Sequence, residues 1–313
     1  MVLHSFIRNF APMKLSVLIP TFNYDCSRLV AQLLLQLPKE GEVIVGDDCS
    51  TDAGIIGKFR EIEAMPRCRT FRPNQNLGRA AIRNALAREA KGEWLLFIDA
   101  DAEVRSSSFI VDYLAAAERS MVNVICGGTG NLPHCPRPEV RLRYDYEVAA
   151  ERRLTLEHRR RHPYAQFTTF NFLVWRTLFL SIGFDEHCKA YGHEDTRFGL
   201  ELKQRGIEIL HIDNKLTHLG LEDADVYIQK TETALRSLAS IDIELRRHIR
   251  VSALALRLKR WHLLGPIRML FQVSKPLLQA NLLGKHPNLK LFAFYKLGYY
   301  SSLRTAFRRQ SGR

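Results

Sequence analysis

Several features that mark other classes of protein are missing from this chain of 313 residues. No run approaches eighteen apolar residues, so we expect no membrane-spanning helix. The first thirteen residues are mixed in polarity and lack the apolar core of a signal peptide. The six cysteines form no C-x-x-C pair and have no metal-ligand spacing, so free thiols in a reducing compartment are expected. Together these absences favour a cytoplasmic protein.

Acidic residues are missing from the last part of the chain. Residues 245–313 contain fifteen Lys or Arg and no Asp or Glu, which leaves 31 of the 46 basic residues and all 33 acidic residues elsewhere. The net charge of +13 therefore belongs to this tail, where basic residues are interspersed with Leu and aromatic residues. Helices of this composition suit an anionic bilayer surface, which is the partner we expect. The same residues could instead dock on the core or on a second copy of the chain. They could also bind nucleic acid, which we do not expect.

Short apolar runs and helical patterns alternate through the first hundred residues. Strands are expected at 14–22, 42–48, 68–72 and 94–99, and helices at 25–37, 51–64 and 79–91. This alternation predicts βαβ units, and hence an α/β fold with a mixed, mainly parallel sheet flanked by helices. A charged helix at 139–161 and short strands at 207–212 and 215–219 are expected farther on, and from residue 223 the pattern is helical. The predicted organisation is a sheet-containing domain over 14–222 and a helical, basic C-terminal region over 223–313.

Two acidic clusters stand about ninety residues apart. Asp99-Ala100-Asp101 ends the apolar run 94–98, and Glu194-Asp195 opens a helical segment after Gly192-His193. Asp-x-Asp at the end of a buried strand commonly holds a divalent cation on a diphosphate, because hard cations take carboxylate and phosphate oxygen together. In parallel sheets ligands bind outside the carboxyl ends of the strands. The two clusters together therefore outline a transferase that uses a sugar nucleotide.

Six motifs in a fixed order carry a family resemblance. They are SVLIPTFN (16–23), VIVGDDCSTD (43–52), NLGRAAIRNAL (76–86), WLLFIDADAEV (94–104), FNFLVWRTLFLSIGFDE (170–186) and YGHEDTRFGLELKQRG (191–206). Taken together they resemble the family 2 glycosyltransferases, nucleotide-sugar enzymes with a GT-A fold. The Gly-His-Glu-Asp form, with HIDNKLTHLGLE (211–222), is similar to bacterial polysaccharide-type members. The resemblance runs from Ser16 to about Glu222 and leaves the tail uncovered.

The resemblance implies roles around the nucleotide. The nucleobase pocket would be lined by Pro20, Thr21 and Phe22. Asp48 would accept a hydrogen bond from the uracil ring N–H, which selects for a base with a donor at that edge. The loop beside the nucleotide would be shaped by Asn76, Gly78 and Arg83, and Asp99 would face the ribose or a metal-bound water.

The resemblance also implies a metal site and a catalytic base. Asp101 would coordinate Mn²⁺ or Mg²⁺, with His218 as the candidate histidine ligand and His211 as its rival. Asp195 would deprotonate the acceptor hydroxyl in an inverting transfer. Glu194 would orient the acceptor or brace the turn, and the acceptor sugar would be flanked by Tyr191 and His193.

The implied protein is a metal-dependent inverting glycosyltransferase of the hexosyltransferase type. It would move a sugar from a nucleotide-sugar, expected to be a UDP-sugar, to a glycan or lipid-linked acceptor in polysaccharide or glycoconjugate biosynthesis. We expect it at the inner face of the cell membrane as a peripheral protein.

Two other functions remain open at this point. A nucleotidyltransferase could use a related sheet, although no Gly-rich, Lys-bearing phosphate loop follows the first strand. A non-catalytic nucleic-acid-binding protein could use the basic tail, but it would have no use for the acidic clusters. Single acids also have structural interpretations: Asp48 could cap the next helix, and Glu194 or Asp195 could be a first-turn acid favoured by the helix dipole.

Overall fold

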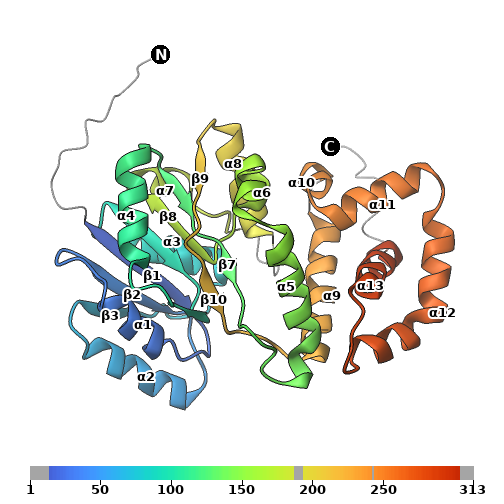
Figure 1. Cartoon of the computed structure of the whole chain (residues 1–313), viewed down its shortest axis with the longest axis horizontal. Helices are drawn as coiled ribbons and strands as arrows, with labels where there is room; N and C mark the ends of the chain where they lie inside the picture. The colour runs from blue at the N-terminus through green and yellow to red at the C-terminus, as the bar shows by residue number, and fades with distance from the viewer. Residues whose placement is uncertain (1–13, 187–192, 242, 304–313) are drawn as a thin grey trace.

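The fold is described from a computed structural model, which places residues 14–186, 193–241 and 243–303 (Figure 1). The strands are β1 Leu15–Thr21, β2 Glu42–Asp47, β3 Cys68–Phe71, β4 Trp94–Ile98, β5 Ala102–Glu103, β6 Val124–Cys126, β7 Thr129–Gly130, β8 Asn171–Trp175, β9 Ile209–His211 and β10 Leu216–His218. The helices before residue 224 are α1 Ser27–Leu34, α2 Ala53–Glu63, α3 Arg79–Glu89, α4 Phe109–Ser120, α5 Arg141–Arg153, α6 Leu156–Arg161, α7 Arg176–Ile182 and α8 Glu194–Gln204. The later helices are α9 Ala224–Ser240, α10 Ile243–His248, α11 Arg250–Arg260, α12 Leu264–Leu282 and α13 Leu289–Ser302. Tyr191, expected to flank the acceptor, lies outside the described residues.

Seven strands form the central sheet in the order β3-β2-β1-β4-β8-β6-β9. β1 pairs in parallel with β2 and β4, and β2 pairs in parallel with β3, so the first four strands belong to successive βαβ units. β8 runs antiparallel between β4 and β6, and β9 returns parallel to β6. A second, small sheet has the order β5-β10-β7. The predicted α/β fold with a mixed, mainly parallel sheet is confirmed.

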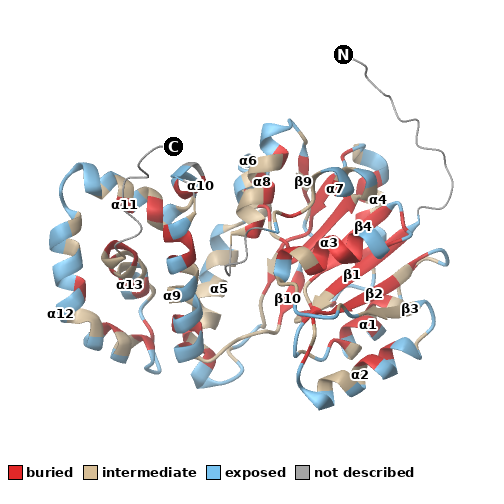
Figure 2. Cartoon of the chain, turned by 180° about the vertical axis from the view of Figure 1, so that it is seen from behind, coloured by how far each residue is buried: buried red, intermediate tan, exposed pale blue. Residues whose placement is uncertain are grey.

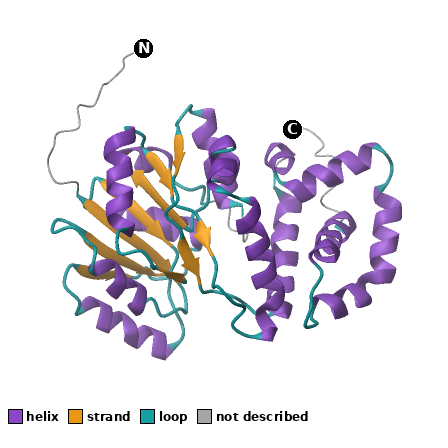
Figure 3. Cartoon of the chain, viewed as in Figure 1, coloured by secondary structure: helices purple, strands orange, loops and turns teal. Residues whose placement is uncertain are grey.

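Helices cover both faces of the central sheet (Figures 2 and 3). On one face, Val17 and Ile19 of β1 belong to a core that includes side chains of α1, α2 and α4. Leu18, between them, belongs to the opposite core with side chains of α3, α7 and α8. This alternation is the two-residue period of a strand that is buried on both sides. The sheet is therefore held rigidly between two helical layers, and its carboxyl edge is left for a site.

The predicted elements of the first hundred residues all occur, within one to three residues of the expected bounds. The charged segment at 139–161 is two helices rather than one. α5 ends at Arg153, and Thr155 caps α6 by accepting a hydrogen bond from the His158 backbone N–H at 3.2 Å. No element had been predicted between residues 105 and 138, where the structure has α4 and β6.

The C-terminal helices pack against α5 and are not a detached arm. Leu142 of α5 shares a buried cluster with Tyr227 of α9, Phe271 of α12 and Phe292 of α13. Figure 1 shows α5 and α9 side by side, with α12 at the outer edge of the molecule. Among the described helices, none is both long and apolar enough to cross a membrane.

Candidate active site

A cavity of about 1310 Å³ opens at the carboxyl ends of β1, β2 and β4. It is bordered on the other side by α5, by the start of α8 and by the segment after β10. With the exception of His211, the candidate residues that the structure describes all line this one cavity: Pro20, Thr21, Phe22, Asp48, Asn76, Gly78, Arg83, Asp99, Asp101, His193, Glu194, Asp195 and His218. Residues nearly two hundred positions apart in the chain therefore share one site.

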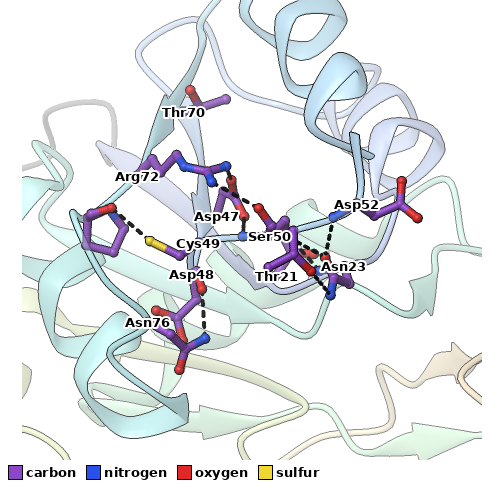
Figure 4. A network of polar contacts seen from close by, with 12 residues as sticks. Thr21, Asn23, Asp47, Asp48, Cys49, Ser50, Asp52, Thr70, Arg72 and Asn76 are labelled. Atoms are coloured by element: carbon purple, nitrogen blue, oxygen red, sulfur yellow. Dashed lines mark hydrogen bonds and ion pairs between the residues drawn. The ribbon is translucent and has the colours of Figure 1, made fainter. Parts of the chain in front are cut away.

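The two acids at the end of β2 have different surroundings (Figure 4). Asp47 is buried, forms an ion pair with Arg72 and accepts a hydrogen bond from the Ser50 backbone N–H at 2.8 Å. Both oxygens of Asp47 are thus committed to structure. Asp48 lines the cavity instead.

Asp48 fixes the loop that precedes α3. Its two oxygens accept hydrogen bonds from the backbone N–H groups of Leu77, at 2.7 Å, and Gly78, at 2.9 Å. The side-chain amide of Asn76 donates to the Asp48 carbonyl at 2.7 Å. Gly78 has a φ of +84°, a conformation that glycine adopts at little cost. The helix-capping interpretation of Asp48 is wrong, because Asp52 caps the next helix, α2, by accepting a hydrogen bond from the Ile55 backbone N–H at 3.1 Å. Each oxygen of the Asp48 carboxylate keeps a second lone pair for a ligand.

Asp99 is held by two arginines of α3. The buried Arg83 forms an ion pair with Asp99 Oδ1, and Arg83 Nη1 donates to the Arg79 carbonyl at 2.9 Å. Arg79 Nη2 lies 3.6 Å from Asp99 Oδ2, and Arg79 Nε lies 3.1 Å from Glu194 Oε1. Arg79 thus connects the Asp-x-Asp segment with the second acidic cluster. Sequence reasoning had given Arg79 no role of its own.

Asp101 and His218 face each other across the small sheet. β5 and β10 pair antiparallel with His218 opposite Ala102, and the Leu219 backbone N–H donates to the Asp101 carbonyl at 2.8 Å. Because of this pairing, Asp101 Oδ2 lies at a distance of 3.1 Å from His218 Nε2. On the far side of the ring, His218 Nδ1 lies 2.9 Å from Glu147 Oε2 of α5.

The electrostatics of this group follow from burial and charge. Burial alone would lower the pKa of His218, but the hydrogen bonds that its ring donates to the carboxylates of Asp101 and Glu147, and their charges, raise it to about 10. Burial alone would raise the pKa of Asp101, but its hydrogen bond with His218 and the charge of that ring hold the pKa below its usual value. The two groups thus form an ion pair in which His218 carries the proton and Asp101 is a carboxylate.

The same geometry fits a divalent cation. Two ligand atoms at adjacent corners of an octahedral ion, with bonds of about 2.1–2.2 Å, lie about 3 Å apart, which is the Asp101–His218 separation. Ligating histidines usually donate their other ring N–H to a carboxylate, and Glu147 stands at that position. Across 14–186, 193–241 and 243–303, no three His, Cys, Asp or Glu side chains are grouped to hold a metal, so the remaining ligands would come from diphosphate and water.

His211, the rival ligand, is engaged elsewhere. Its Nδ1 lies 3.3 Å from Arg159 Nη1, and its Nε2 lies 2.9 Å from the Pro163 carbonyl. Burial lowers its pKa to about 4, so the ring is neutral and accepts from Arg159 at Nδ1. The structure places His218, and not His211, against Asp101.

Glu194 and Asp195 begin α8. His193 precedes them with a φ of +82°, which turns the chain so that the first helical turn meets the cavity. Asp195 Oδ1 accepts from the Thr196 backbone N–H at 2.7 Å. Burial, and then the charge of Glu194, raise the pKa of Asp195. A carboxylate with a raised pKa is a better general base than an ordinary aspartate.

One face of α5 forms a cavity wall that sequence reasoning missed. Its side chains recur at helical spacing, and Leu154 follows them directly after the helix: Arg143, Tyr146, Glu147, Ala150 and Glu151. The polar stripe was readable in the predicted helix at 139–161, but nothing in the sequence shows that this stripe faces the strand ends.

The glycosyl transferase family 2 model matches residues 16–185 of the chain. The chain belongs to this family. The matched region holds the first four strands with Asp48, Asp99 and Asp101, and this is the family that the sequence motifs resemble.

Two curated relatives match shorter segments. An uncharacterized glycosyltransferase of Haemophilus influenzae is 34% identical over 89 residues, which span 28% of this chain and 29% of that protein. The poly(ribitol-phosphate) β-N-acetylglucosaminyltransferase TarS of Staphylococcus aureus is 36% identical over 97 residues, which span 28% of this chain and 16% of TarS. The family 2 transferase described here thus aligns with less than a third of either relative.

Solved structures share the fold over most of the chain. The mannosyltransferase PcManGT of Pyrobaculum calidifontis, in complex with GDP-Man and Mn²⁺, superposes with a TM-score of 0.58 at 16% identity, covering 93% of this chain and 86% of that one. TarS 1–349 of S. aureus, in complex with UDP, gives 0.51 at 22% identity, covering 92% and 89%. The predicted GT-A fold of this family 2 transferase is confirmed.

Proposed function

We propose that this glycosyltransferase uses a UDP-sugar and a divalent cation, and transfers the sugar with inversion to a glycan or lipid-linked acceptor in polysaccharide or glycoconjugate biosynthesis. The observation that carries the proposal is the Asp101–His218 pair, backed by Glu147, in the cavity that also contains Asp48 and Asp195. Relatives in the same fold bind UDP in one case and GDP-Man with Mn²⁺ in another.

The nucleotide would lie at the ends of β1 and β2. Asp48 faces the cavity from a loop held by three hydrogen bonds, so its position is fixed before a ligand arrives. A fixed acceptor at this point suits a base with a ring N–H, as uracil has. Phe22 is half exposed beside it and offers a ring for stacking, with Pro20 and Thr21 completing the pocket wall.

Asp101 and His218 would hold the cation on the donor diphosphate. Bound Mn²⁺ or Mg²⁺ neutralises the charge that develops on the leaving diphosphate. Asp99 is already neutralised by two arginines, so it suits a hydrogen bond to ribose better than direct ligation. Of the two carboxylates of the Asp-x-Asp segment, Asp101 alone would then bind the metal.

Asp195 would be the base. It takes the proton from the acceptor hydroxyl while that oxygen forms a bond to the anomeric carbon. The bond from the anomeric carbon to the diphosphate oxygen breaks on the opposite face and its electron pair leaves with the nucleotide, so the configuration inverts. Glu194 is paired with Arg79 and would position the turn rather than accept the proton.

The cavity has room for both substrates. Its volume of about 1310 Å³ exceeds the roughly 300–1,000 Å³ of a typical single-ligand pocket. The wall beyond Asp195 is formed by α5 and carries both charges, with Arg143, Glu147 and Glu151. A polar, hydroxyl-rich acceptor fits this wall. The acceptor pool would lie at the cytoplasmic face of a membrane, where the basic C-terminal helices would keep the enzyme as a peripheral protein.

A nucleotide screen tests the proposal. UDP-, GDP- and dTDP-sugars are added with Mn²⁺ or with a chelator, and thermal unfolding is followed for wild type, Asp101→Ala and the exposed control Glu118→Ala of α4. A ligand at a hundred times its dissociation constant adds about 2.7 kcal/mol of stability. We expect this stabilisation from UDP-sugars with Mn²⁺, retained in Glu118→Ala and lost in Asp101→Ala. The proposal would be contradicted if UDP-sugars stabilised the protein equally with Mn²⁺ and with the chelator, and equally in wild type and Asp101→Ala.

A further inference from the structure

Helix α12 is apolar on two opposite faces. Phe271, Leu278 and Leu282 are buried against the rest of the C-terminal helices. The opposite face exposes Met269, Leu270, Val273 and Leu277, with 67%, 58%, 77% and 76% of their surface accessible. The spacing i, i+1, i+4, i+8 puts these four on one stripe, which Pro266 and Ala280 extend at both ends. We call this stripe the α12 outer face.

The α12 outer face presents four neighbouring apolar side chains to solvent. Single exposed apolar residues are ordinary, but contiguous apolar patches on soluble proteins mark interaction sites. Figure 2 shows α12 exposed along its length at the end of the molecule farthest from the sheet. The α12 outer face is therefore expected to be covered by something other than this chain's own core.

The chain segment that contains α12 carries charge of one sign. Residues 245–303 contain no Asp or Glu. Exposed basic side chains stand at both ends of α12 and along its flank: Arg257, Lys259, Arg260, Arg268, Lys285 and Lys290. Trp261, just before α12, is also exposed and carries the Arg257 guanidinium 4.7 Å from its ring centroid. An apolar stripe with a basic rim and a tryptophan matches the layers of an anionic lipid interface.

We infer that the α12 outer face inserts into the interfacial layer of an anionic bilayer and is the surface that docks this enzyme on its membrane. The inference rests on the proposed membrane location and names the element responsible for it. A second copy of the chain is the less suitable occupant, because a symmetric contact through this face would bring the two basic rims together. In a bilayer, the anionic headgroups would instead pair with the exposed Lys and Arg side chains, while the α12 outer face would insert at the boundary of the acyl chains.

The position of α5 connects the docking surface to the site. Tyr146 of α5 lines the cavity and also packs edge-on against Phe292 of α13, with ring centroids 5.6 Å apart. The α13 helix in turn packs on α12, where Phe271 and Tyr295 lie 5.3 Å apart. Packed side chains thus connect the α12 outer face, through α13, to the face of α5 that lines the cavity. This packing would keep the cavity at a fixed distance from the bilayer.

Vesicle co-sedimentation of full-length protein tests the inference. The key variant is Val273→Gln with Leu277→Gln, which removes apolar surface, leaves the charge unchanged and keeps good helix formers in place. Its matched control is Leu35→Gln, since Leu35 is 88% exposed at the end of α1, on the sheet-containing domain. Vesicles are neutral phosphatidylcholine, with or without phosphatidylglycerol, at low and at high salt. Circular dichroism and thermal stabilisation by UDP with Mn²⁺ show that each variant is folded and binds its nucleotide.

We expect wild type and Leu35→Gln to bind phosphatidylglycerol vesicles at low salt and the double variant to bind at least tenfold more weakly, since two large apolar side chains no longer insert. Equal binding by the double variant and wild type would overturn the inference, because charge alone would then explain docking. Failure of wild type to bind anionic vesicles would also overturn it, as would a wild-type dimer in analytical ultracentrifugation that the double variant abolishes. None of these outcomes depends on glycosyl transfer, so a failure of the proposed reaction would be seen separately, in the nucleotide screen.

Discussion

Replacing Gly220 by Ala should disable the metal site with a single methyl group. A β-carbon at this position would overlap Asp101 Oδ2 and would lie 2.8 Å from Asp101 Cγ and 3.0 Å from His218 Nε2. Ordinary contact begins at 3.4 Å, so the Asp101 carboxyl carbon, 2.8 Å away, would have to retreat by about 0.6 Å. Metal–ligand distances are held within about 0.2 Å. The required shift is therefore several times what a coordinating carboxylate tolerates.

The cost to the fold should be much smaller than the cost to the metal. The overlap falls on the end of a side chain, which can rotate away, so we expect the free energy of unfolding to drop by no more than about 1–3 kcal/mol. Displacing one of two protein ligands should weaken Mn²⁺ binding by at least the 10- to 100-fold that loss of a supporting contact causes. Free Mn²⁺ is measured by electron paramagnetic resonance during titration, with UDP present.

Gly57→Ala is the matched control. Gly57 lies in the middle of α2, and a β-carbon there meets nothing within 4 Å. This change should stabilise the helix by about 0.5–1 kcal/mol and leave Mn²⁺ binding unchanged. Wild-type Mn²⁺ affinity in a folded Gly220→Ala protein would refute the reasoning, because the Asp101–His218 pair could not then be the metal site.

Three further predictions concern the base, the nucleobase pocket and a buried histidine. Asp195→Asn cannot take up a proton, so transfer should fall by about 10²-fold or more while UDP-sugar binding persists; near-wild-type turnover would assign the base elsewhere. Asp48→Ala should weaken UDP binding, measured by calorimetry, by roughly 1–3 kcal/mol, the cost of leaving a buried donor unpaired; equal affinity of wild type for UDP and GDP would argue against the pocket. The pKa of His211 is lowered to about 4 by burial, below the 6.5 of an unfolded chain, so the unfolded state takes up the proton first as pH falls. Its contribution to stability should be present above pH 6.5 and should drop by about 2 kcal/mol between pH 7 and pH 5 in urea unfolding. His211→Gln should remove this part of the decrease in unfolding free energy between pH 7 and pH 5. If the decrease were the same in the variant as in wild type, another group would be responsible.

The strands and their end residues were predictable because both signals are local. Each early strand is a short apolar run, as in Trp94–Ile98, and the polar residue that follows it must stand at the carboxyl edge of a parallel sheet. Asp48, Asp99 and Asp101 could therefore be located without knowing any contact. The choice of Asp48 over Asp47 came from the family resemblance and not from a local signal.

The partners of these residues were not predictable, because they are set by packing between distant elements. Arg79 meets Glu194 across 115 positions, and Glu147 meets His218 only because α5 lies against the second sheet. The preference for His218 over His211 depends on the pairing of β10 with β5, two very short strands. Likewise, the sequence predicts helices in the tail, and only the tertiary arrangement shows which apolar face of α12 stays exposed.

Anomalous scattering from Mn²⁺ in crystals grown with UDP would test the central claim most directly. The account predicts one strong peak about 2.0–2.3 Å from both an Asp101 oxygen and His218 Nε2, in contact with the diphosphate, with the uracil N–H directed at Asp48. A peak on other side chains, or UDP bound in the cavity with no metal at this pair, would contradict it.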